Sequence, residues 1–132
     1  MKRVLGRYAD VFFTLLRIVV GFTFACHGAQ KLFGVLGGTR ADIALMKFAG
    51  VVEFGGGVLI ALGLFTGIAA FIASGEMAAA YFMVHAKGSF WPIINKGELA
   101  VVYCFLFLYI AAHGAGRWSL DGIMGRRSAL PR

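Results

Sequence analysis

Two consecutive apolar stretches decide the fold of this chain. Residues 48–84 read FAGVVEFGGGVLIALGLFTGIAAFIASGEMAAAYFMV, and their only charged side chains are Glu53 and Glu76. Each half has about the 17–20 residues that cross roughly 30 Å of hydrocarbon, and a turn at residues 65–67 separates the halves. Neither half alternates like a barrel strand, and a bilayer excludes open sheet edges. The stretch therefore predicts an antiparallel pair of membrane helices over 48–64 and 67–84.

Two further apolar stretches, 11–26 and 99–113, flank this pair. The 132 residues are 60% hydrophobic with a mean hydropathy of +0.82, and 19 are glycine, which suits closely packed membrane helices. The expected fold class is all-α, an antiparallel integral membrane four-helix bundle in a single domain over 1–132. The basic N-terminus could begin a signal peptide, but Arg17 interrupts its apolar region, so we expect a retained first span.

The basic residues predict the orientation in the membrane. By these spans, the side of the two termini carries Lys2, Arg3, Arg7, Arg117, Arg126, Arg127 and Arg132, and the opposite side carries Lys31, Arg40, Lys47, Lys87 and Lys96. Because cytoplasmic loops carry the excess of lysine and arginine, both termini are predicted to be cytoplasmic, in the plasma membrane. Topology explains the net charge of +7 better than nucleic-acid binding does.

Three charged side chains lie inside the apolar stretches: Arg17, Glu53 and Glu76. A charge in hydrocarbon costs several kcal/mol, so such residues need a partner or a task. Arg17 lies ten residues before His27 and Glu76 nine before His85, which at about 1.5 Å per residue gives both the same depth. We therefore expect Arg17 and Glu76 to pair. Together with Glu53, this pair could transfer protons. Alternatively, it could only set how the helices pack.

Helical spacing predicts a central polar cavity that opens to the outer side. Steps of three and four place shared faces on three stretches: Arg17, Gly21, Phe24, Gly28 and Lys31; Glu53, Gly57, Ile60 and Leu64; and Glu98, Phe105, Tyr109 and Ala112. The candidate ligand-binding residues are His27, Lys31, His85, Asn95, Glu98, Phe24, Phe90 and Trp91. The two histidines could instead anchor helix ends.

Other chemistry is less well supported by the sequence. No HxxH or ExxH repeat is present, so no metal site is predicted. Cys26 and Cys104 are expected to be small residues at helix contacts, with a redox pair as the alternative. Gly55-Gly56-Gly57 lacks the lysine and serine of a phosphate-binding loop and predicts close helix packing instead.

Four motifs resemble the DoxX-like family of small membrane proteins over nearly the whole chain. They are Leu16-Arg17 through His27 to Gly34, the segment Glu53-Phe54-Gly55-Gly56-Gly57, Glu76-Met77 through His85 to Glu98, and Gly114 to Asp121. Lys96 departs from the family, which usually has glycine there. The resemblance implies a four-helix bundle linked to quinone-dependent oxidoreduction or to complexes that handle oxidative stress, without assigning a reaction.

Three functions follow as hypotheses. The first is a subunit that binds a quinone or similar amphipathic ligand within an oxidoreductase complex. The sequence has no haem-attachment, iron–sulfur or flavin motif, so this subunit would be free of intrinsic cofactor and would depend on a partner. The second is a structural or assembly subunit. The third is a small proton-coupled transporter, which acts as an oligomer. Whether the chain is an enzyme stays open.

Overall fold

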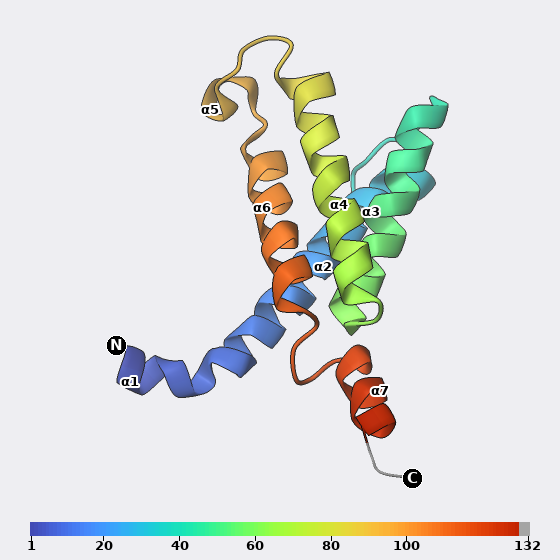
Figure 1. The fold of residues 1–132 in the computed structure, drawn as a ribbon. Helices are drawn as coiled ribbons and strands as arrows, with labels where there is room; N and C mark the ends of the chain where they lie inside the picture. Colours follow the sequence, from blue (N-terminus) through green and yellow to red (C-terminus); the bar gives the residue numbers. More distant parts are fainter. Residues whose placement is uncertain (130–132) are drawn as a thin grey trace.

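All secondary-structure elements in the described part of the chain are helices (Figure 1). The computed structural model describes the backbone of residues 1–129 and the side chains of residues 1–125. The elements are α1 (Lys2–Leu5), η1 (Gly6–Tyr8), α2 (Ala9–Phe33), α3 (Ala44–Leu62), α4 (Thr66–Ala80), η2 (Tyr81–His85), α5 (Pro92–Asn95), α6 (Glu98–His113) and α7 (Leu120–Ala129). The prediction of an all-α fold is confirmed.

Three helical segments are long and apolar enough to cross a membrane: Lys2–Phe33, Ala44–Leu62 and Thr66–His85. The fourth predicted span corresponds to α6, which is apolar but has only 16 residues. The prediction of a helical membrane protein is therefore confirmed. A fourth complete crossing and the cytoplasmic position of the termini stay predictions.

The first helix extends further at its C-terminal end than predicted. We expected a helix over 11–26, but α2 continues to Phe33 and ends only at Gly34, whose φ of +65° is the left-handed conformation that favours glycine. Polar residues after Cys26 suggested an exit from the membrane, yet they continue the helix. The third expected stretch corresponds to α4 and the π-helical turn η2, and the short helices α5 and α7 were not predicted.

The helices form two antiparallel pairs, α2 with α3 and α4 with α6, and a tight turn joins α3 to α4 (Figure 1). Glycine sets the distance within the first pair. A Cβ at Gly28 would lie 2.2 Å from the Phe54 nitrogen, and one at Gly57 would lie 2.5 Å from the Ala25 nitrogen. Close packing is thus confirmed at Gly57 but is wrong for Gly55, which has nothing within 4 Å.

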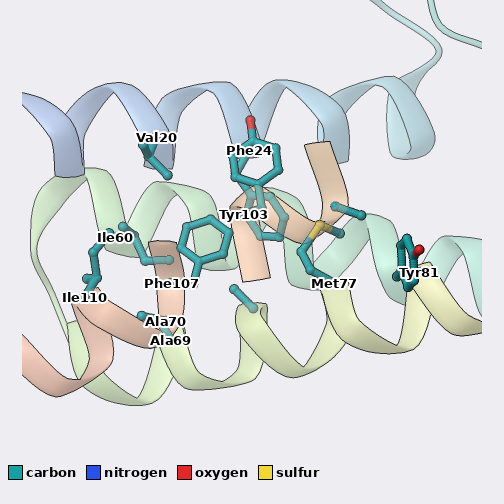
Figure 2. Close-up of a cluster of buried hydrophobic side chains, with 12 residues drawn as sticks. Val20, Phe24, Ile60, Ala69, Ala70, Met77, Tyr81, Tyr103, Phe107 and Ile110 are labelled. Atoms are coloured by element: carbon teal, nitrogen blue, oxygen red, sulfur yellow. The ribbon is translucent and has the colours of Figure 1, made fainter. Parts of the chain in front are cut away.

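Aromatic rings from α2 and α6 fill the core between the pairs (Figure 2). The rings of Phe24 and Phe107 meet edge to face with centroids 4.6 Å apart, and Tyr103 stacks on Phe107 at 5.4 Å. Small residues on α4 make room for these rings: Ala69, Ala70 and Ala73.

The predicted inner face of α6 is wrong. Its buried residues are Ala100, Tyr103, Phe107 and Ile110, whereas Glu98, Phe105, Tyr109 and Ala112 are exposed. The helix is apolar on every side, so spacing alone could not distinguish the face toward the core from the face toward lipid.

Candidate functional site

A cavity of about 750 Å³ lies among α2, α3, α4 and α6. Six predicted site residues line it: Phe24, His27, Lys31, Glu53, Glu76 and His85. Most of the remaining wall is apolar. Exposed side chains of α3 and α4 form part of that wall, among them Phe48 and Ile72, which are 64% and 51% exposed. The cavity is therefore open where α3 and α4 carry these exposed side chains.

An ion pair between α2 and α3 forms the polar wall of this cavity. The Nζ of Lys31 lies 2.6 Å from both Oε1 and Oε2 of Glu53, and the Glu53 side chain is only 3% exposed. Glycine makes this geometry accessible, because a Cβ at Gly50, one turn before Glu53, would meet the Lys31 side chain at 3.0 Å. Each residue was a separate candidate from the sequence, and their pairing was not predicted.

Glu76 of α4 lies beside this pair. Its carboxyl group lines the same cavity as Glu53 and Lys31 and is close enough to both for an electrostatic interaction. Its Oε2 is buried and has no hydrogen-bond partner among the described residues. We refer to Lys31, Glu53 and Glu76 as the polar cluster.

The predicted pair of Arg17 and Glu76 is wrong. The guanidinium of Arg17 donates hydrogen bonds to three backbone carbonyls: those of Ala115, Trp118 at 3.0 Å and Ala61 at 3.3 Å. Since α2 ends at Phe33, Arg17 lies 16 residues, or about 24 Å, below its outer end. That places Arg17 at the end of the bundle where the turn joins α3 to α4, far from Glu76 along the bundle.

Arg17 is thus a structural residue that attaches the segment after α6 to the bundle. Asp121 completes the attachment, because its two carboxylate oxygens each accept a hydrogen bond of 2.9 Å, from the backbone N–H groups of Phe65 and Thr66. Partial burial tends to raise the pKa of Asp121, but these N–H donors and the charge of Arg17 hold it below its usual value. The motif Gly114 to Asp121 therefore has a clear structural role.

Asn95 is the last residue of α5 and does not line the cavity. Its Nδ2 donates hydrogen bonds to the Ser89 carbonyl at 2.7 Å and to the Tyr81 hydroxyl at 3.1 Å, while its Oδ1 accepts one from the Gly97 N–H. His85 does line the cavity, and its Nδ1 lies 3.3 Å from the Asn95 carbonyl. Asn95 therefore holds the loop against the π-helical turn that carries His85.

Three other candidates also lie away from the cavity. Phe90 and Trp91 are 65% and 63% exposed, as expected of rings at a membrane interface. Glu98 lines a separate, shallower hollow with Pro92 and Val102.

Sequence reasoning missed several residues that line the cavity. Lys87 and Lys96 were counted only for topology, and Tyr103 lies on the face of α6 that was assigned to lipid. The Tyr103 hydroxyl donates a hydrogen bond of 2.8 Å to Thr23. The sequence held no signal for Tyr103, because α6 also carries Tyr109, which is exposed.

The described residues contain no convergent group of three metal-ligating side chains, and both cysteines are free. Cys104 packs beside Ser74, whose hydroxyl donates a hydrogen bond of 2.7 Å to the Cys104 carbonyl.

Comparisons with known proteins agree with the membrane fold. The DoxX family model matches residues 12–86, which include the whole polar cluster. An uncharacterized protein of Haemophilus influenzae is 46% identical over 125 residues, covering 89% of this chain and 93% of its own. An uncharacterized membrane protein of Mycobacterium tuberculosis is 26% identical over 132 residues, covering 86% and 81%. No solved structure matches. The chain therefore belongs to the DoxX family of membrane proteins.

Proposed function

We propose that this protein binds a quinone or a similar amphipathic molecule in its cavity, as a subunit linked to quinone-dependent oxidoreduction in the plasma membrane. The cavity itself is the observation that carries the proposal. Its volume of about 750 Å³ is within the range of roughly 300–1,000 Å³ that is typical of small-molecule sites. A mostly apolar wall with a few convergent polar groups is also the usual composition of such sites.

The shape of the cavity supports a ligand that dissolves in lipid. Exposed side chains of α3 and α4 line its open side, so a hydrophobic molecule can reach it from the bilayer. The polar cluster and the two histidines then offer hydrogen-bonding groups to a polar head, while Phe24 and Tyr103 provide aromatic contact.

Electron transfer belongs to a partner protein in this proposal. The sequence has no motif for haem, an iron–sulfur cluster or flavin, so the protein would hold the ligand while another subunit supplies the redox cofactor. Assembly with such a partner, or with further copies of this chain, is part of the proposal.

Binding of decyl-benzoquinone to the protein in lipid nanodiscs tests the proposal. Ala79 lines the cavity and is exposed, so Ala79→Phe fills the space with little strain on the core. Val19→Phe is the matched control, because Val19 is 57% exposed on α2 and does not line the cavity. We expect at least tenfold weaker binding to Ala79→Phe and unchanged binding to Val19→Phe. Absence of binding to the unmodified protein, or equal binding by both variants, would refute the proposal.

A further inference from the structure

The polar cluster contains one cation and two acids at the wall of a membrane cavity. The Nζ of Lys31 lies 2.6 Å from both carboxylate oxygens of Glu53. The carboxylate of Glu53 therefore largely neutralises the positive charge of Lys31. Glu76 lies beside the pair, and its Oε2 has no hydrogen-bond partner among the described residues. With both acids ionised, the cluster carries a net charge of −1 in a poorly solvating environment, which is costly. One proton on the two carboxyl groups makes it neutral.

The position of the cluster makes this charge balance sensitive to what fills the cavity. Glu53 and Glu76 both line the cavity, so water there can solvate a second carboxylate charge. An uncharged ligand that replaces this water removes that solvation, and the cost of the extra charge rises as the local dielectric constant falls. The neutral cluster is then favoured.

We infer that Glu76 is a proton-binding site linked to ligand occupancy: an uncharged amphipathic ligand enters the cavity together with one proton, which the Glu53–Glu76 pair holds. The inference rests on the proposed function. The proton comes from water, and no bond of the ligand changes. Since the bound state holds more protons than the empty state, affinity rises as the pH falls, by up to tenfold for each pH unit.

Other charged or titratable groups also face Glu76 across the cavity. They are His27 and Lys31 on α2, Glu53 on α3, His85 at the end of η2, Lys87 in the turn after it, Lys96 before α6, and Tyr103 on α6. Exclusion of water disfavours a cationic group, so a proton exchanged at a histidine would be released when a ligand binds. The direction of proton transfer therefore distinguishes the polar cluster from the histidines.

Calorimetry of decyl-benzoquinone binding in nanodiscs tests this inference, because the probe has no titratable group. Titrations in two buffers with different heats of ionisation, between about pH 5 and about pH 8, give the number of protons taken up per ligand. We expect an uptake approaching one proton per bound ligand for the unmodified protein and near zero per bound ligand for Glu76→Gln, each measured at ligand concentrations that saturate the site. Asp42→Asn is the control, because Asp42 is exposed in the outer loop and does not line the cavity.

The outcomes separate this inference from the proposed function. Binding without proton uptake, with proton release, or with undiminished uptake in Glu76→Gln would overturn the inference and leave the cavity as a ligand site. No binding at all would overturn both. If Glu76→Gln does not fold, infrared spectroscopy of the unmodified protein tests whether a carboxyl group takes up a proton when the probe binds. The band of protonated carboxyl groups should grow when the probe is added, and an unchanged band would overturn the inference.

Discussion

Gly28→Ala tests whether close contact between α2 and α3 holds the bundle and its site together. A Cβ at Gly28 would lie 2.2 Å from the Phe54 nitrogen and 2.7 Å from the Gly50 oxygen. These are backbone atoms, so the helices themselves must separate, by roughly 1 Å, to reach van der Waals distance. A gap of that size removes about a quarter to a half of the dispersion energy of the neighbouring contacts.

The expected loss of stability follows from two opposing terms. Overpacking typically costs about 1–3 kcal/mol, and here a rigid backbone must yield. Alanine gains back up to about 1 kcal/mol through its higher helix propensity. We therefore expect Gly28→Ala to lower the free energy of unfolding by about 2 kcal/mol. The Lys31–Glu53 ion pair lies one turn away across the same contact, so ligand binding should weaken as well.

Unfolding in mixed micelles with increasing SDS, followed by circular dichroism, measures this change. Gly55→Ala is the matched control, because a Cβ there has nothing within 4 Å and the helix should become more stable by up to about 1 kcal/mol. Equal stability of Gly28→Ala and the unmodified protein, or equal destabilisation by both substitutions, would refute the packing argument.

Three further predictions concern the charged groups. Arg17→Met leaves three backbone carbonyls without their donor and should cost about 3 kcal/mol in the same unfolding assay; an unchanged midpoint would contradict its structural role. Because the folded-state pKa of Asp121 is lowered, its stabilising effect is present above the unfolded-state pKa and is lost as the pH falls through the folded-state value. Asp121→Asn should therefore flatten the acid side of a profile of melting temperature against pH, and a parallel profile would argue against a stabilising role for the hydrogen bonds from Phe65 and Thr66 to Asp121. Lys31→Met leaves the buried carboxylate of Glu53 unpaired and should cost about 3–5 kcal/mol. Adding Glu53→Gln should recover part of that loss, and a double variant as unstable as the sum of the two single variants would exclude the pairing.

The sequence by itself determined the helices and most of the polar residues of the cavity wall. Long apolar stretches with few charges can satisfy their backbone hydrogen bonds in a bilayer only as helices, which is why α3, α4 and α6 were predicted close to their observed limits. The spacing on the first stretch also identified its inner face, since Arg17, Gly21, Phe24 and Gly28 are all buried. Polar residues that follow such a face are natural candidates for a cavity, and Lys31 does line it.

Only the tertiary structure decided which charges meet. Counting residues gave Arg17 and Glu76 the same depth because the first helix was taken to end near His27, whereas α2 continues to Phe33 and so places Lys31 opposite the acids. The inner face of α6 was undetermined for a related reason, because a helix that is apolar all round has no preferred face until its neighbours are in place. Which charged side chains pair depends on where the helices end and on how they are tilted and rotated relative to one another. These are set by contacts between distant segments, such as Gly28 against Phe54, and local sequence pattern does not contain them.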